Sequence, residues 1–196
     1  PAIERAGLLK LRQESLVSHY LDQIDLALKP DADNGLPNIP KALDDIRSAL
    51  ALFPRDAELL RVKAQIEDRQ IALQDAIDAE INSTLTQGNY NNTEDSKTLL
   101  KLARNLEFLG GQLSRPSDTA IAGYMKRVRG ALDAFDALQQ AHLLTIGNRF
   151  FAGATKTEAQ RLELDKLKDA AIALAHYQET ANTETPSSFP REAALV

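Results

Sequence analysis

The 196-residue sequence contains no cysteine, so disulfide bonds, thiolate metal sites and a cysteine nucleophile are excluded. This absence fits an oxidising periplasm somewhat better than the cytoplasm, although many cytosolic domains of this size also lack cysteine. Tryptophan is missing too, and only 5% of the residues are aromatic, while 43% are hydrophobic. Leucine, alanine and isoleucine therefore carry most of the apolar surface, and they suit close packing between helices. The composition predicts an all-α protein.

Long apolar runs are absent as well. No stretch approaches the ~18 residues of a membrane span, and no charged-then-apolar signal peptide opens the chain. We therefore expect no insertion of this segment into a membrane. The chain begins Pro1-Ala2 without an initiator methionine, so we expect it to be processed or cut from a longer protein, and a lost anchor or partner domain stays open.

The sequence has fewer basic than acidic side chains. The sequence has 23 basic and 28 acidic side chains, which gives a net charge of -5. Such a chain has no general attraction for phosphate backbones, so we expect no binding to nucleic acid.

Side chains arranged for catalysis are also missing. His19, His142 and His176 fall on three separate predicted helices, and none forms the His-x3-His or Glu-x2-His spacing of a metal site. Pairs of acidic residues that lie close together in the sequence are expected to be solvated charges on polar helix faces. The sequence has no phosphate-binding loop, dinucleotide fingerprint or nucleophile elbow. We therefore expect no enzyme, no cofactor and no metal.

What the sequence does contain is an internal echo. The stretch Leu85-Thr86-Gln87-Gly88-Asn89-Tyr90 returns fifty-nine residues later as Leu144-Thr145-Ile146-Gly147-Asn148-Arg149. Each copy follows a long helical pattern, and each glycine stands where a helix would end in a left-handed cap. The echo predicts a helix-turn-helix unit used twice, and internal repetition of this kind indicates stacked helices.

Apolar periodicity, prolines and capping residues divide the chain into predicted helices. These helices cover residues 2–29, 41–53, 57–87, about 93–109, 118–146 and about 156–177, with a three-proline loop over 30–40. They pair as hairpins over 2–53, 57–110 and 118–180 within one domain over 1–181. The polar segment 182–196 is expected to be a mobile tail.

Two of these helices have an expected buried stripe that the structure can test. In the first helix the stripe consists of Leu9, Leu16, Tyr20, Ile24 and Leu28. In the 57–87 helix it consists of Leu60, Ala64, Ile71, Ile77, Ile81 and Leu85.

The spacing Ala42-x3-Ile46-x2-Ala49-x4-Pro54 resembles the second helix of a tetratricopeptide repeat, and Arg55 to Leu60 resembles the passage into the next repeat. Thr86 to Tyr90 also resembles the tight turn of that family. The resemblance implies helical hairpins stacked as a solenoid, with an inner face that holds a peptide. The 57–87 helix is longer than the usual unit, and Asn91 to Glu94 adds residues before the next helix.

The predicted partner-binding residues follow from this resemblance. Asp75, Asp78 and Asn82 lie at i, i+3 and i+7 on one face of the 57–87 helix, which would be the inner face. Fifty-nine residues later the equivalent positions hold Ala134, Ala137 and Ala141, which would line a shallow groove or a helix-helix contact. Lys126 and Arg129, from the densest basic cluster, would border the site, although a solvated helix face is the simpler explanation of that cluster.

We therefore predict an all-α, tetratricopeptide-like solenoid that acts as a non-enzymatic scaffold and binds a peptide or partner protein. The sequence leaves the partner and the oligomeric state open. The alternative is an extracytoplasmic sensory or signalling bundle attached to a larger membrane protein, in which the 57–87 and 118–146 helices pack antiparallel.

Overall fold

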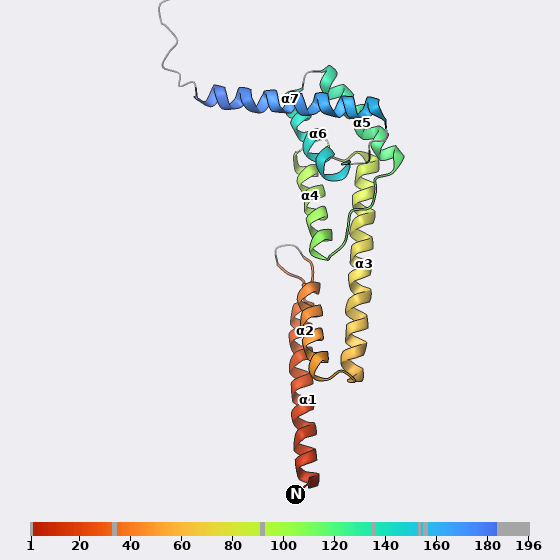
Figure 1. Cartoon of the computed structure of the whole chain (residues 1–196), viewed down its shortest axis with the longest axis vertical. Coiled ribbons are helices and arrows are strands. Elements are labelled where there is room, and N and C mark those ends of the chain that lie inside the picture. Colours follow the sequence, from red (N-terminus) through yellow and green to blue (C-terminus); the bar gives the residue numbers. More distant parts are fainter. Residues whose placement is uncertain are drawn as a thin grey trace, which may run out of the picture. The chain divides into compact units, whose positions relative to one another are not determined.

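The computed structural model describes residues 2–32, 35–90, 93–134, 136–152, 154 and 157–183. In these ranges the protein is all-α, with seven helices and no strand (Figure 1). The helices are α1 Ala2–Ala27, α2 Ile39–Leu52, α3 Ala57–Gln87, α4 Thr93–Phe108, α5 Asp118–Asp133, α6 Ala137–Phe150 and α7 Glu158–Thr183.

The chain divides into two compact units. The first comprises Pro1–Ile81 and Thr98–Ser114, and the second comprises Asn82–Lys97 and Arg115–Val196. Each unit is described by itself below. The single domain over 1–181 stays a prediction.

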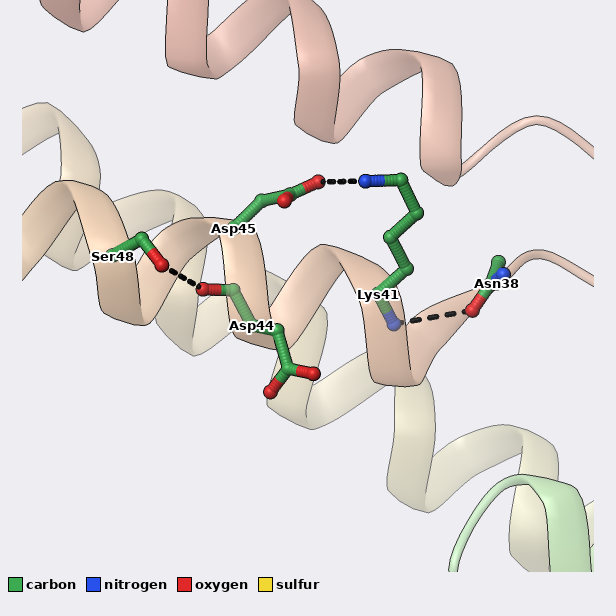
Figure 2. Close-up of polar contacts among 5 residues, drawn as sticks. All are labelled: Asn38, Lys41, Asp44, Asp45 and Ser48. Carbon is green, nitrogen blue, oxygen red and sulfur yellow. Dashed lines mark hydrogen bonds and ion pairs between the residues drawn. The ribbon is translucent and has the colours of Figure 1, made fainter.

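In the first unit α1 packs against α2. The loop between them ends where capping residues start α2. Figure 2 shows Asn38 accepting a hydrogen bond at 3.1 Å from the backbone N–H of Lys41, which caps the helix. Pro40 occupies the first helical turn, where its missing N–H does no harm. Within the next turns Lys41 donates to Asp45 at 2.9 Å, and the Ser48 hydroxyl donates to the Asp44 carbonyl. Local chemistry thus sets the start of α2.

The inward face of α2 carries the residues of the tetratricopeptide resemblance. Ala42, Ile46 and Ala49 are all buried, as a stripe with helical spacing requires. The predicted loop between α1 and α2 is present too: Pro30 and Pro37 form an isolated bridge, and Gly35 adopts a left-handed φ of 73°. Residues 33 and 34 lie outside the described ranges.

The stripe predicted for α1 is correct only in its C-terminal half. Ile24 is buried and Tyr20 and Leu28 are half-buried, whereas Leu9 and Leu16 are 68% and 43% exposed. The reason is length, since α1 has 26 residues and α2 has 14, or about 39 Å and about 21 Å at 1.5 Å per residue. Within this unit α2 therefore cannot cover the N-terminal half of α1.

The bounds predicted for α3 are confirmed, but its predicted stripe is wrong in the first half. Asp56 caps the helix by accepting from the N–H groups of Glu58 and Leu59, both at 3.1 Å. The buried residues of α3 are Leu59, Ile66, Ile77, Ile81 and Leu85, and Leu60 and Ile71 are 48% and 55% exposed. Ala64 is exposed as well. In the first half of α3, Leu59 and Ile66 are thus buried in place of Leu60 and Ala64, and two half-buried polar side chains lie between Ile66 and Ile77 on the inward face.

Those polar side chains are Gln70 and Gln74, which hold the end of α4. Their amides donate to the Leu109 carbonyl at 2.6 and 2.7 Å. This carbonyl belongs to the last turn of the helix, where no intrahelical partner exists. Gly110 then ends α4 in a left-handed conformation with φ of 77°, as its position after the predicted helix indicated.

Because two side-chain amides donate to the same carbonyl, we expect their effects on stability to be non-additive. Replacing either Gln70 or Gln74 with methionine should lower the free energy of unfolding by about 0.5 kcal/mol or less, because the other amide still donates. The double variant should lose about 1–2 kcal/mol, since a part-buried carbonyl then lacks its donors. Urea denaturation measures both, with exposed Gln65→Met as the control. Additive losses would contradict the shared-acceptor interpretation.

In the second unit the prediction of one helix over 118–146 is wrong, because two separate helices, α5 and α6, occupy this range. Ser117 caps α5 by accepting a hydrogen bond from the Ala120 N–H at 3.1 Å. After α5 ends at Asp133, the side chain of Asp136 accepts from the Gln139 N–H at 3.0 Å and starts α6. Gln140 is buried and donates to the Ala131 carbonyl at 2.9 Å, which satisfies the end of α5.

The two echoed glycines also differ. Gly88 ends α3 with a φ of 73°, as predicted, but Gly147 lies inside α6 and is not left-handed. The second predicted turn is therefore wrong, and α6 continues to Phe150. At this position in the helix, Gly147 lies directly against the Tyr124 side chain.

The last helix is longer than predicted. It extends to Thr183, so Asn182 and Thr183 are helical rather than part of the predicted tail. Residues 184–196 of that tail lie outside the described ranges. Along α7 Leu167 is buried and Leu162 is 57% exposed.

Candidate binding site

An aromatic cluster occupies the core of the second unit. The rings of Tyr124 and Phe151 stack with centroids 4.3 Å apart and an interplanar angle of 11°. Tyr90 approaches Phe151 at 6.5 Å with its ring tilted by 58°. All three side chains are buried. The three rings thus form an aromatic part of the buried core of this unit.

The Tyr124 hydroxyl is fixed by the backbone of α6. It donates to the Leu143 carbonyl at 3.0 Å. A methyl group on Gly147 would collide with this hydroxyl and lie 3.0 Å from the Tyr124 Cζ, so a glycine is required for the close approach. Burial raises the pKa of Tyr124 well above its usual value, and the neighbouring Tyr90 adds to the increase. The hydroxyl therefore stays protonated and remains a donor at neutral pH.

A pocket of about 340 Å³ opens over this pair, and we call it the Tyr124 pocket. It is lined by Tyr124, Leu144, Gly147, Asn148, Phe151, Ala152, Arg161, Leu164, Asp165 and Lys168. Leu144 and Leu164 are half-buried and supply its apolar wall, whereas the Tyr124 and Phe151 rings are fully buried. Arg161, Asp165 and Lys168 supply three charges from α7, with Lys168 and Asp165 3.6 Å apart. The pocket thus combines an apolar interior with charges of both signs.

Arg127 holds the turn after α3 against the same core. Its guanidinium donates to the Gly88 carbonyl at 3.3 Å and to the Gly123 carbonyl at 3.2 Å, and it lies 5.3 Å from the Tyr90 ring centroid. Burial raises the pKa of the Tyr90 hydroxyl, and the positive charge of Arg127 opposes the increase. The Tyr90 hydroxyl is buried without a hydrogen-bond partner in the described part of the chain.

His142 and Ser96 lie close enough to suggest a base and a nucleophile. The His142 Nε2 is 2.6 Å from the Ser96 hydroxyl and also 2.6 Å from the Tyr90 carbonyl. A carbonyl only accepts, so Nε2 must carry a proton to make that bond, and it then cannot accept the Ser96 proton. The Ser96 hydroxyl instead donates to the Tyr90 carbonyl at 3.2 Å. The geometry is that of a structural bond between α4, α6 and the turn, which the sequence did not reveal.

The structure places the predicted partner-binding residues in two units. Asp75 and Asp78 belong to the first unit and Asn82 to the second. Asp75 is exposed, and Asn82 is half-buried. Asp78 is half-buried and accepts a hydrogen bond at 3.1 Å from the Ser114 N–H, so part of its capacity already holds the linker after α4.

The predicted basic pair divides as well. Lys126 and Arg129 are exposed on α5, but Arg129 donates to Glu163 on α7 at 2.7 Å, and this bond raises the pKa of the guanidinium. Arg129 therefore links α5 to α7. Its partner Glu163 directly precedes Leu164, which lines the Tyr124 pocket.

The predicted alanine groove requires a correction. It assumed one helix through Ala134, Ala137 and Ala141, whereas Ala134 follows the end of α5 and the other two residues belong to α6. The spacing of i, i+3 and i+7 no longer puts the three on one face.

Sequence reasoning missed the Tyr124 pocket because its walls come from three helices. One local signal was present: Arg161, Leu164, Asp165 and Lys168 have the i, i+3, i+4, i+7 spacing of a single helix face. The aromatic partner for that face could not be identified from spacing alone.

The chain matches no protein-family model, and no curated protein or solved structure matches it. Across the described residues, no three or more His, Cys, Asp or Glu side chains come together in a way that could hold a metal ion. In that same part of the chain, no helix combines the length and the apolar composition needed to cross a membrane.

Proposed function

We propose that this chain is a non-enzymatic protein-interaction domain, and that the Tyr124 pocket receives an apolar side chain from a partner protein or peptide. The observation that supports the proposal is the pocket itself, a stacked aromatic pair under a rim that carries charges of both signs. Apolar pockets with a few polar groups at the edge are the usual form of a binding site.

The size of the pocket favours one side chain over a large ligand. Its volume of about 340 Å³ is near the lower end of the ~300–1,000 Å³ typical of small-molecule sites. An aromatic or leucine side chain that enters the pocket would contact the half-buried Leu144 and Leu164, which makes apolar contacts the centre of the proposed interface. Arg161 and the Asp165–Lys168 pair then favour a partner segment with mixed charge around that side chain.

The tetratricopeptide-like arrangement is part of the same proposal. It is supported by the antiparallel helices α1 and α2 and by the buried Ala42, Ile46 and Ala49 at their contact. The sensory bundle assumed a second long helix over 118–146, and the break after Asp133 removes that helix. We therefore favour the interaction domain.

Selection of peptides from a displayed random library, with the full chain as bait, tests the proposal. Ala152 is exposed and lines the pocket, so Ala152→Trp should fill it. Selected peptides should bind at least tenfold more weakly to this variant, a change of about 1.4 kcal/mol. Ala64→Trp on the exposed face of α3 is the matched control and should leave binding unchanged.

Equal binding to both tryptophan variants would reject the pocket as the site. In that case the predicted partner-binding residues of α3 are tested with Asp75→Ala and Asn82→Ala. Asp78 is left unchanged because it also accepts a hydrogen bond from the Ser114 N–H, and its loss would disturb the fold. A library that yields no specific peptide would reject peptide binding.

A further inference from the structure

A pocket of about 320 Å³ opens between α1 and α3 of the first unit, and we call it the Asp25 pocket. Its apolar wall consists of Leu21 and Leu28 from α1 and of Val62 and Ile66 from α3. Ile66 is buried and the other three side chains are half-buried. Part of their apolar surface is therefore still open to water, and covering it favours binding.

Four charged side chains also line the Asp25 pocket, and two of them pair with each other. Arg61 donates to Glu58 at 2.6 Å, so these two charges offset one another. Asp25 on α1 and Arg69 on α3 are exposed, and neither side chain has a hydrogen bond or ion pair within the part of the chain that the structure describes. The pocket thus presents one negative and one positive group, from different helices, that do not pair with each other.

A neutral polar group stands beside the positive one. Gln65 lines the pocket and lies one helical turn before Arg69, at i and i+4 on the same face of α3. Its amide contains both a donor and an acceptor, and no hydrogen bond of this side chain is present among the described residues. A carboxylate placed here would accept from both the amide and the guanidinium.

The volume and the charges of the pocket restrict the class of ligand. A volume of about 320 Å³ is near the lower end of the ~300–1,000 Å³ typical of small-molecule sites, so a small ligand fits best. A purely anionic ligand would meet Asp25 and Glu58, and a purely cationic one would meet Arg61 and Arg69. A neutral apolar ligand would take water away from charged groups without replacing it. A ligand with one charge of each sign and an apolar body avoids all three costs.

We propose that the Asp25 pocket binds a free α-amino acid with an apolar side chain, such as leucine. The ammonium group of the ligand pairs with Asp25, and its carboxylate accepts hydrogen bonds from Arg69 and Gln65. Its side chain covers the apolar wall that includes Val62 and Ile66. The site lies in the first unit, so it is separate from the Tyr124 pocket and does not depend on the function proposed for that pocket.

Three probes with the same carbon branch test the two charges separately. They are leucine, 4-methylpentanoate, which lacks the ammonium group, and 3-methylbutylamine, which lacks the carboxylate. In NMR titrations of the isotope-labelled full chain, leucine should bind about tenfold or more tightly than either analogue, because each analogue loses one charge-assisted hydrogen-bonded pair.

Two substitutions assign each charge of the ligand to its side chain. Asp25→Asn should weaken leucine binding about tenfold and leave 4-methylpentanoate unchanged. Arg69→Gln should weaken leucine and 4-methylpentanoate by a similar factor and leave 3-methylbutylamine unchanged. Asp22→Asn on α1 and Arg55→Gln just before α3 are the matched controls, since both residues are exposed and neither lines the pocket. Circular dichroism and thermal melting check that each variant stays folded.

Several results would overturn the proposal. Failure of leucine, isoleucine, methionine and phenylalanine to bind would reject an amino-acid site. Leucine binding that survives both Asp25→Asn and Arg69→Gln would show that the pocket does not recognise the two charges. Ala152→Trp, which fills the Tyr124 pocket, should leave leucine binding unchanged. Loss of leucine binding in that variant alone would place the ligand in the Tyr124 pocket instead.

Discussion

Gly147→Ala should lower the free energy of unfolding by about 2 kcal/mol, although alanine in place of glycine normally stabilises a helix by about 1 kcal/mol. The added methyl group would meet the Tyr124 hydroxyl and lie 3.0 Å from its Cζ. The ring cannot move away easily, because it is buried, stacks on Phe151 at 4.3 Å and donates to the Leu143 carbonyl. Valine, with a larger and β-branched side chain, should lower the stability further.

Gly130→Ala is the matched control, since this glycine also lies inside a helix, α5, and a methyl group there would meet nothing within 4 Å. This variant should gain about 0.5–1 kcal/mol. Chemical denaturation of the pair measures the difference. In a Tyr124→Phe background, part of the Gly147→Ala loss should disappear, because the hydroxyl that collides with the methyl group is absent. Equal effects at the two glycines would contradict the assigned contact.

Gly88→Ala should lower the free energy of unfolding by about 2 kcal/mol for two separate reasons. The left-handed φ of 73° disfavours any residue with a Cβ by about 1 kcal/mol. In addition, the new methyl group would collide with the Arg127 guanidinium. Arg127 would have to leave the Gly88 carbonyl and the Tyr90 ring, and charge-assisted hydrogen bonds are worth about 1.5–3 kcal/mol before the side chain finds new partners.

Gly35 separates these two reasons. It has the same φ of 73° in the loop between α1 and α2, but a methyl group there would meet nothing within 4 Å. Gly35→Ala should therefore lose only the backbone contribution, about 1 kcal/mol. Thermal melts of both variants, repeated in an Arg127→Ala background, measure the contribution of Arg127. If Gly88→Ala and Gly35→Ala lose the same amount with Arg127 present, the guanidinium contact does not stabilise the turn.

These two contacts also support the Tyr124 pocket. Gly147 lines the Tyr124 pocket, and its missing side chain lets the Tyr124 ring approach α6 closely. Arg127 and His142 hold the turn that carries Tyr90, which packs near Phe151 on the same aromatic cluster. Under the proposed function, a pocket supported in this way is shaped before a partner binds, which reduces the entropy lost on binding.

The sequence by itself determined the elements whose ends depend on local chemistry. Asp56 and Ser117 stand directly before the helices predicted from residues 57 and 118 and cap α3 and α5, and Gly88 ends α3, because each effect acts within one turn of the chain. The all-α character follows from the same kind of signal, repeated along the chain.

Tertiary structure decided whatever depends on a distant neighbour. Gly88 and Gly147 stand in nearly the same local sequence, yet one ends a helix against Arg127 and the other stays inside a helix against Tyr124. On the inward face of α3, Gln70 and Gln74 bond to a carbonyl more than thirty residues away, which helical periodicity of apolar residues alone could not indicate. The Tyr124 pocket has the same origin: its walls come from α5, α6 and α7, and the propensities of single helices do not encode how those helices meet.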